Sequence, residues 1–220
     1  MHIVLGSENP GKVREFEALL APYGHKLTSL VDYDFAQAPE TGCTFVENAL
    51  LKARHTAQQT NLPCLADDSG LVVAALNGAP GLYSSRYNSL FDPDGLTDGL
   101  SKDAANIARL LNEMHAQTDR EAHFYCALVL VRHPLDPAPL IATGQWRGQI
   151  AHEPSGDNGF GYDPIFLDAT SGKSAADLAS DEKRVISHRG IAWRELSNHC
   201  LLYTSPSPRD QRGSRMPSSA

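Results

Sequence analysis

Two adjacent carboxylates, Asp67 and Asp68, precede Ser69 and Gly70 between two apolar runs. Hard cations such as Mg²⁺ prefer carboxylate oxygens and keep several waters, which leaves room for substrate phosphates. A carboxylate beside such a metal can also orient or deprotonate an attacking water. A turn with two solvated aspartates is the commoner explanation of such a run, so the pair alone does not establish a metal site. Glu40 is a further carboxylate in a predicted turn, and it indicates nothing by itself.

Ser7, Asn9 and Lys12 lie where a short strand is expected to turn into a helix. Free backbone N–H groups at a helix start, the helix dipole, a hydroxyl and an ammonium together could hold a phosphate. The spacing is not that of a Walker loop. An ordinary strand-to-helix turn has the same composition, and both interpretations stay open on this motif alone.

Two later segments offer groups that could recognise a base. In the run Gly159–Pro164 the glycines permit close approach to a ligand, Phe160 provides a stacking face and Asp163 provides an acceptor. Three donors follow within a short span: Lys183, His188 and Arg189. Each segment also has a structural explanation, because an aromatic residue on a glycine-rich turn often anchors a core and a basic helix start is often solvated.

The rest of the sequence predicts the elements that position these groups. Hydrophobic runs predict strands at His2–Leu5, Cys64–Ala66, Leu71–Ala74, Phe124–Arg132, Leu140–Ile150 and Ile165–Leu167. Periodicity and capping signals predict helices from Pro10 to about Pro22, from Thr44 to about Asn61, and at Asn106–Met114, Ser174–Ala179 and His188–Cys200. Residues 88–103 are predicted to form a long loop. The irregular alternation favours an α/β or α+β fold around a mixed sheet.

Composition limits the classes of protein to which the chain can belong. Its 220 residues, 41% of them hydrophobic, suit one compact domain or two lobes that share a core. A net charge of −7 without a basic run argues against a nucleic-acid partner but permits binding of a single triphosphate. Four scattered cysteines without a Cys-x-x-Cys pair argue against a zinc site or a disulfide framework. The sequence has neither a signal-peptide core nor an apolar run of roughly 20 residues, so we expect a soluble cytoplasmic protein with no membrane partner.

Leu201–Ala220 differs from the preceding sequence because it is polar, rich in Pro, Ser and Arg, and without periodicity. A disordered or partner-binding tail is one interpretation. The segment also resembles sequence at the ends of translated metagenomic reads in which a sequencing adapter was read through. We therefore expect residues 1–200 to form the functional two-lobed domain, and residues 201–220 to be a non-native or disordered tail after a truncated helix.

In their order along the chain and in their amino-acid sequences, the motifs together resemble those of the inosine triphosphate pyrophosphatase family. This family comprises the bacterial pyrophosphatases of noncanonical purine nucleoside triphosphates. The segments that carry the resemblance are Ser7–Lys12, Glu40–Ala49, Ala66–Leu71, Gly78–Gly81, Phe160–Pro164 and Ser187–Gly190. They extend over essentially residues 1–199, and such a set of separate motifs in fixed order is highly specific. The departures are mild: Ser7 stands where the family more often has Thr, and the loop around Phe91–Lys102 is longer.

The resemblance implies an α/β fold, in which an elongated mixed β-sheet with flanking helices forms two lobes around a central active-site cleft. It implies a homodimer and an Mg²⁺-dependent attack of water on the α-phosphorus, which releases pyrophosphate from ITP, dITP or XTP. Glu40 and Asp68 would hold Mg²⁺, with Asp68 also the proton acceptor and Asp67 in support. The substrate-binding residues that the resemblance implies are Ser7, Glu8, Asn9, Pro10, Gly11, Lys12, Ser69, Phe160, Gly161, Tyr162, Asp163, Lys183, His188 and Arg189.

The resemblance also assigns separate tasks to the base-binding residues. Phe160 would stack on the purine, and Asp163 would accept the N1–H that hypoxanthine and xanthine have and adenine lacks. The three donors Lys183, His188 and Arg189 would contact the 6-oxo group and nearby acceptors. Two alternatives stay open: a Maf-like nucleotide pyrophosphatase with another base preference, and a nucleotide-binding module without catalysis. The base-binding residues argue against the first, and the carboxylates argue against the second.

Overall fold

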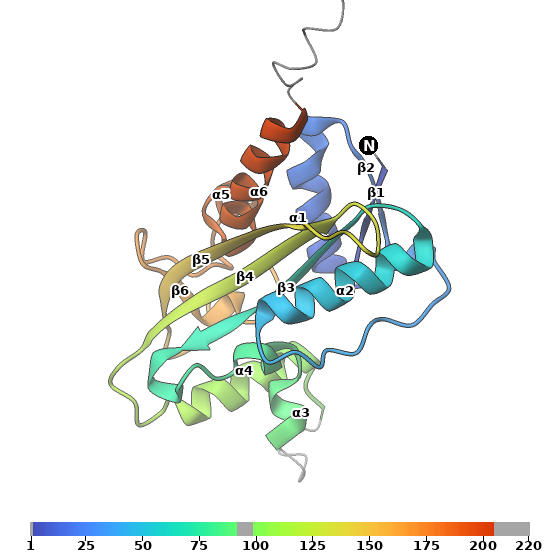
Figure 1. Cartoon of the computed structure of the whole chain (residues 1–220). Helices are drawn as coiled ribbons and strands as arrows, with labels where there is room; N and C mark the ends of the chain where they lie inside the picture. The colour runs from blue at the N-terminus through green and yellow to red at the C-terminus, as the bar shows by residue number, and fades with distance from the viewer. Residues whose placement is uncertain (1, 92–98, 205–220) are drawn as a thin grey trace, which may run out of the picture.

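The computed structural model of the chain describes residues 2–91 and 99–204. In this part of the chain six strands form one mixed sheet, in the order β2-β1-β3-β4-β5-β6. Their bounds are His2–Leu5 (β1), Lys26–Ser29 (β2), Cys64–Val73 (β3), Glu121–Val131 (β4), Leu140–Ile150 (β5) and Phe166–Asp168 (β6). β1 pairs in parallel with β2 and β3, and the later neighbours pair antiparallel (Figure 1). The α/β fold with a mixed sheet is confirmed, although the sequence did not predict β2.

Six helices accompany the sheet in the described residues: Pro10–Leu20 (α1), Phe45–Thr60 (α2), Tyr87–Phe91 (α3), Lys102–Glu113 (α4), Ser180–Ile186 (α5) and His188–Thr204 (α6). Local sequence explains where the first two begin. The side chain of Asn9 accepts hydrogen bonds from the N–H groups of Gly11 and Lys12, and Thr44 caps α2 in the same manner. None of the described helices is both long and apolar enough to span a bilayer.

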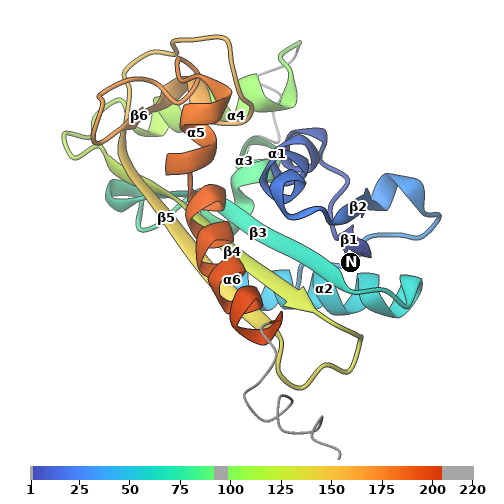
Figure 2. The ribbon, with the colours of Figure 1, turned by 90° about the horizontal axis from the view of Figure 1, so that it is seen from above.

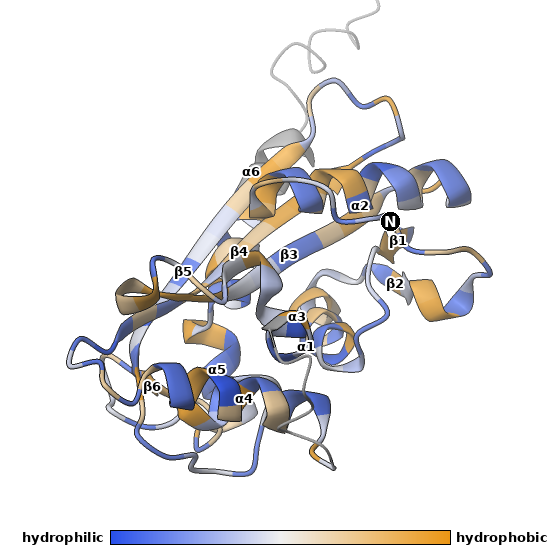
Figure 3. Cartoon of the chain, turned by 90° about the horizontal axis from the view of Figure 1, so that it is seen from below, coloured by the Kyte–Doolittle hydropathy of each residue, from blue (hydrophilic) through white to orange (hydrophobic). Residues whose placement is uncertain are grey.

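The two faces of the sheet are covered by different helices, because side chains alternate along each strand. On one face, Ala49, Ala53 and Ala57 of α2 pack against small residues of β3 and β4. α2 has hydrophobic and hydrophilic residues along its length, as expected for a helix with one covered side (Figure 3). α1 and α6 cover the opposite face through residues that include Phe16 and Leu196, and α6 runs along β4 and β5 (Figure 2).

A second core occupies the other end of the face that α1 and α6 cover. There, Leu110 and Met114 of α4 pack in one cluster with Leu71 of β3 and Phe124 of β4. Leu71 and Leu65 are an even number of residues apart, and Leu65 faces α1 and α6, so both cores lie on the same side of β3. The two cores form the two lobes, and the middle of β3 lies between them.

β3 is one continuous strand that contains both predicted strand segments, Cys64–Ala66 and Leu71–Ala74 up to Val73, so only the predicted polar interruption between them was wrong. The polar residues Asp67–Gly70 remain in the ladder, since they pair with Tyr125–Leu128 of β4. Their backbone groups are therefore satisfied within the sheet although the hydrophobic run is interrupted. The polar side chains sit in the centre of a strand and not in a turn.

The predicted helix at Ser174–Ala179 was also wrong. Ser174 forms a β-bridge with Leu167, and its hydroxyl lies 3.0 Å from the carbonyl oxygens of both Ser155 and Asp163. These contacts hold the segment against the glycine-rich loop, and the helix begins only at Ser180. The local propensity of the segment is overridden by its tertiary contacts.

The other helix boundaries differ less from the predicted ones. α4 begins at Lys102, before the predicted Asn106, and α3 overlaps the start of the predicted loop of residues 88–103. Residues 92–98 of that loop lie outside the described residues. α6 continues to Thr204, into the segment predicted as a tail. Residues 205–220 lie outside the described residues, so the nature of the tail stays a prediction.

β5 and α6 approach each other closely at Gly144. A Cβ at this position would overlap backbone atoms of His188 and Ala192. Because Gly144 has no side chain, the first turn of α6 packs directly on β5. The contact fixes the start of α6, and with it Arg189, beside the middle of the sheet.

We expect Gly144→Ala to lower the free energy of unfolding by about 1–3 kcal/mol, the usual cost of inserting atoms into a packed contact. Chemical denaturation measures the change. Gln145→Ala, on the exposed neighbouring residue, is the matched control and should change the unfolding free energy by no more than about 0.5 kcal/mol. Equal stability of Gly144→Ala and the wild type would show that α6 is not fixed by this contact.

Candidate active site

The middle of β3 presents polar side chains on both faces of the sheet. Asp67 and Ser69 contact Arg189 of α6, whereas Asp68 contacts Lys52 of α2. Both carboxylates are buried. Strand alternation therefore gives two carboxylates that are adjacent in sequence separate environments and separate partners.

On the α2 face, one ammonium joins two carboxylates. Lys52 Nζ lies 2.7 Å from Asp68 Oδ1 and 3.3 Å from Glu40 Oε1. Arg86 holds the other oxygen of Glu40 through a contact of 2.8 Å, and the amide of Asn48 lies 3.4 Å from Asp68 Oδ2. The loop that carries Glu40 is thereby drawn to β3. The structure thus brings the two predicted metal ligands together.

The ionisation of this cluster follows from burial and charge. Burial raises the pKa of Asp68, and the ammonium of Lys52 opposes the rise only in part. Burial also disfavours the charged form of Lys52, but the carboxylates of Asp68 and Asp67 outweigh this effect and raise the pKa of Lys52. Glu40 is less buried, and Arg86 and Lys52 outweigh its desolvation and lower its pKa. Asp68 is the carboxylate of this cluster that accepts a proton most readily.

The donor atoms of Glu40 and Asp68 fit a magnesium ion of the kind that acts on phosphates. Mg²⁺ is commonly held by one or two carboxylates and completes its shell with water and substrate phosphates. Both side chains are within reach of the single cation Lys52, so they can share another cation. No group of three or more metal-binding acidic, His or Cys side chains occurs among the described residues.

On the opposite face, Asp67 is the centre of a buried group of charges. Lys12 Nζ lies 2.9 Å from Asp67 Oδ2, and Arg189 Nε lies 3.3 Å from the same oxygen. The hydroxyl of Ser69 donates to Asp67 and accepts from Arg189. Burial opposes ionisation of Asp67, but Lys12 and Arg189 outweigh it and hold its pKa well below the ordinary range. Asp67 is therefore ionised and fixed by its partners.

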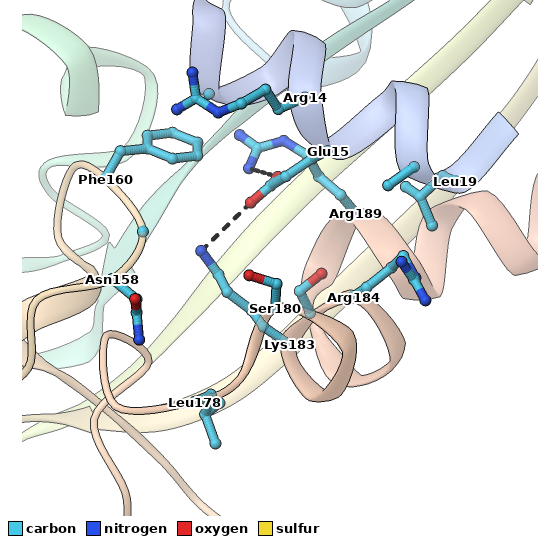
Figure 4. A pocket seen from close by; sticks show the side chains of 14 residues that line it. Arg14, Glu15, Leu19, Asn158, Phe160, Leu178, Ser180, Lys183, Arg184 and Arg189 are labelled. Carbon is cyan, nitrogen blue, oxygen red and sulfur yellow. Dashed lines mark hydrogen bonds and ion pairs between the residues drawn. The ribbon is translucent and has the colours of Figure 1, made fainter. Parts of the chain in front are cut away.

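The same face continues from Arg189 towards the glycine-rich loop. Arg189 NH1 contacts Glu15 at 2.7 Å, Glu15 contacts Lys183 at 3.3 Å, and Lys183 contacts Asp163 at 2.6 Å. Figure 4 shows the carboxylate of Glu15 between these two cations. Cations and anions thus alternate along a series of contacts that we name the ion-pair chain: Lys12, Asp67, Arg189, Glu15, Lys183 and Asp163.

The start of α1 differs from the predicted phosphate site. The N–H groups of Gly11 and Lys12 are not free, because both donate to the side chain of Asn9. The N–H of Asn9 donates in turn to the hydroxyl of Ser7. A capping side chain thus satisfies these N–H groups, and the phosphate-binding role of Ser7 and Asn9 stays a prediction. Lys12, paired with Asp67, is the cation that this segment supplies.

Phe160 packs on α1 through a residue without a side chain. A Cβ at Gly11 would lie 2.7 Å from the Phe160 ring. The cationic groups of Lys183 and Arg189 lie 5.3 and 5.4 Å from the ring centroid. Asp163 accepts a hydrogen bond from the N–H of Phe160 at 2.8 Å, which fixes the turn that carries the ring. Phe160 therefore combines an apolar face with two cations beside it.

His188 is buried in an aromatic stack. Its ring lies nearly parallel to that of Phe124, with centroids 4.8 Å apart. Burial, together with the neighbouring Arg189 and Lys183, lowers its pKa well below the ordinary value. The imidazole is neutral at physiological pH, and its Nδ1 has no hydrogen-bond partner among the described residues. A neutral imidazole can still donate or accept one hydrogen bond.

Two cavities adjoin these groups in the described part of the chain. The first, of about 220 Å³, is lined by these predicted residues: Asn9, Lys12, Glu40, Asp68, Ser69, Phe160, Gly161, Tyr162, Asp163, His188 and Arg189. The second, of about 240 Å³, shares Phe160 and Arg189 with the first and is also lined by Gly11, Glu15 and Lys183 (Figure 4). Ser7, Glu8 and Pro10 line neither cavity. The hydroxyl of Tyr162 donates to the carbonyl of Ser84, so Tyr162 also joins the glycine-rich loop to the segment that contains Ser84.

Sequence reasoning missed Lys52, Asn48, Glu15 and Arg86. A signal existed for the first two, because Asn48, Lys52 and Thr56 repeat at helical spacing beside the alanines that pack on the sheet. A polar stripe on the covered side of a helix indicates a buried polar partner. Glu15 and Arg86 gave no such signal, since a single charged residue on a helix is usually solvated.

Known proteins resemble this chain over nearly its whole described length. Residues 3–199 match the model of the Ham1 family. A dITP/XTP pyrophosphatase from Ralstonia nicotianae is 49% identical over 201 residues, which is 91% of this chain and 97% of that protein. A dITP/XTP pyrophosphatase from Escherichia coli is 48% identical over 196 residues, or 88% of this chain and 95% of that protein. A HAM1 protein from Coxiella burnetii has a solved structure that superimposes with a TM-score of 0.80 at 45% identity, covering 92% of this chain and 99% of that one.

These similarities include every segment that forms the two charged groups around β3. They agree with the resemblance that the motifs indicated from sequence alone. Because the family model and the relatives cover most of the chain, the chain belongs to the Ham1 family.

Proposed function

We propose that the chain hydrolyses noncanonical purine nucleoside triphosphates, among them ITP, dITP and XTP, to the monophosphate and pyrophosphate. The observation that supports this most is the pair of adjoining cavities: one has Glu40, Asp68 and Lys12 in its wall, and the other has purine-sized space beside Phe160. The relatives named dITP/XTP pyrophosphatases support the same substrates. The triphosphate would occupy the first cavity and the base would lie at the border with the second.

Asp68 serves as the proton acceptor in this proposal. The oxygen of a water molecule bonds to the α-phosphorus, the bond from that phosphorus to the oxygen bridging to the β-phosphate breaks, and the water proton moves to Asp68. Its raised pKa suits this role. Lys12 neutralises charge on the leaving pyrophosphate. Glu40 and Asp68 would hold Mg²⁺, which when bound supplies further charge neutralisation on the phosphate oxygens.

The base is recognised by groups on the border between the two cavities. Phe160 stacks on the purine, and the carboxylate of Asp163 accepts the N1–H. Lys183 and Arg189 donate to the 6-oxo group and its surroundings, and neutral His188 contributes one further hydrogen bond. Adenine has no N1–H and carries an amino group at position 6, so it would leave both the acceptor and the donors unpaired.

The alternatives make different demands on the site. A Maf-like enzyme would not need the purine-recognising groups, and a module without catalysis would not need the paired carboxylates Glu40 and Asp68. The named relatives also favour the purine triphosphate activity over both. The cytoplasmic location and the homodimer stay predictions from sequence and resemblance.

The deciding experiment is pyrophosphate release from a panel of nucleoside triphosphates with and without Mg²⁺. We expect ITP and XTP to be hydrolysed at least about 10²-fold better than ATP, because two mispaired polar groups cost about 1–3 kcal/mol each. Arg189→Ala should narrow this gap by lowering the rate with ITP more than the rate with ATP, and thermal unfolding checks its fold because Arg189 also pairs with buried Asp67. Equal kcat/KM for ATP and ITP in the wild type would contradict the base recognition, and activity that does not depend on a divalent metal would contradict the role of Glu40.

Lys12→Ala should reduce kcat/KM for ITP by about 10–100-fold, because a hydrogen bond to a charged group contributes about 1.5–3 kcal/mol. Steady-state kinetics with saturating Mg²⁺ measures the effect. Lys26→Ala, on the exposed end of β2, is the control and should leave the kinetics unchanged. If Lys12→Ala has wild-type kcat/KM, the turn before α1 serves only to connect two elements.

A further inference from the structure

The ion-pair chain connects the two ends of the proposed substrate site. Its first cation, Lys12, lines the cavity assigned to the triphosphate, and its last anion, Asp163, lies on the loop assigned to the base. Between them stand Asp67 and Glu15, neither of which is assigned a contact with substrate. Each is shared by two cations: Asp67 by Lys12 and Arg189, and Glu15 by Arg189 and Lys183.

Because each of these carboxylates contacts two cations, the strength of each ion pair in the chain depends on that of the next one. When buried Asp67 loses one of its two cations, it binds the remaining one more strongly, because no water can replace the lost partner. A phosphate that draws Lys12 away from Asp67 therefore strengthens the hold of Asp67 on Arg189. The ion pair between Glu15 and Arg189 is then weakened, and the ion pair between Glu15 and Lys183 is strengthened.

The change ends at the base-binding loop. As Lys183 shifts towards Glu15, it neutralises Asp163 less. Asp163 Oδ2 already accepts from Lys183 and from the N–H of Phe160, whereas its Oδ1 has no hydrogen-bond partner among the described residues. A carboxylate that is less neutralised by its ammonium is a better acceptor for the N1–H of a 6-oxopurine.

We propose that Asp67 and Glu15 are positioning residues that couple the two ends of the site, so that phosphate bound at Lys12 strengthens the binding of a 6-oxopurine at Asp163. This inference rests on the proposed function for the identity of the two ligands. Coupling between binding sites is reciprocal, so the base strengthens phosphate binding by the same factor. An intact nucleoside triphosphate occupies both ends of the site, so each part of the substrate strengthens the binding of the other part. Departure of pyrophosphate returns Lys12 to Asp67 and loosens the hold on the monophosphate product.

The test measures binding of inosine to the full chain with and without saturating inorganic tripolyphosphate, without metal so that no turnover occurs. Titration calorimetry gives both dissociation constants. We expect tripolyphosphate to tighten inosine binding by about fivefold or more, at the lower end of typical coupling between sites. Glu15→Gln removes the charge in the middle of the chain, and its two dissociation constants should agree within twofold.

Two further variants make the outcome specific. Glu17→Gln is the matched control, because Glu17 is an exposed carboxylate on the same helix and lies outside the ion-pair chain, and it should keep the wild-type ratio. Asp67→Asn tests a second link, with its fold checked by thermal unfolding. If Asp67→Asn does not fold, Glu15→Gln alone decides, since Glu15 is partly exposed.

A loss of affinity alone does not support the coupling, since a purely structural role would produce it. The supporting result is a ratio near one in Glu15→Gln beside a ratio of about five or more in the wild type and in Glu17→Gln. A wild-type ratio near one, an unchanged ratio in Glu15→Gln, or no inosine binding even with tripolyphosphate would each overturn the inference. Hydrolysis of ITP by the same wild-type sample separates the two claims: activity without coupling overturns this inference only, and no activity overturns the proposed function.

Discussion

The burial of Asp67 in the centre of the sheet is the constraint on which the arrangement of this protein depends. A fully buried carboxylate is costly unless it is paired and hydrogen-bonded. Here Lys12 comes from α1 and Arg189 from α6, so both helices must meet at the middle of β3. One charge therefore fixes the relative positions of three elements that are far apart in sequence.

Strand alternation turns this structural requirement into a division of roles. Asp67 faces cations that keep it ionised and immobile, whereas Asp68, the next residue, faces α2 and the cavity with a raised pKa. A turn, the alternative that the sequence left open, would expose both carboxylates to water. In the continuous strand Asp67 stabilises the fold, and Asp68 remains available for catalysis.

Elements with strong local signals could be predicted from the sequence. α1 and α2 have Asn9 and Thr44 as caps, β4 has a long hydrophobic run and β5 alternates buried with exposed residues, so their positions follow from local preferences. β3 could not be predicted as one strand, because the ladder with β4 satisfies a polar segment that hydropathy alone assigns to a turn. The predicted helix at Ser174–Ala179 failed for the related reason that distant carbonyl groups hold Ser174.

The candidate site was predictable only where residue types are unusual together. The motifs indicated Asp68, Lys12, Phe160 and Arg189, and all four line the cavities. The stripe of Asn48, Lys52 and Thr56 indicated a buried polar partner without identifying it, and Glu15 gave no signal. Pairing across the fold is a tertiary property, and local periodicity does not contain it.

The role of Asp68 is tested most directly by the turnover number of purified Asp68→Asn with ITP and saturating Mg²⁺. An amide neither binds Mg²⁺ well nor accepts a proton, so we expect a folded protein whose kcat is reduced at least about 10²-fold. Asp103→Asn is the matched control: Asp103 lines the same cavity and accepts from the N–H of Gly161, a bond that an amide oxygen can replace, and this variant should keep most of the activity. A kcat of Asp68→Asn close to that of the wild type would contradict the account.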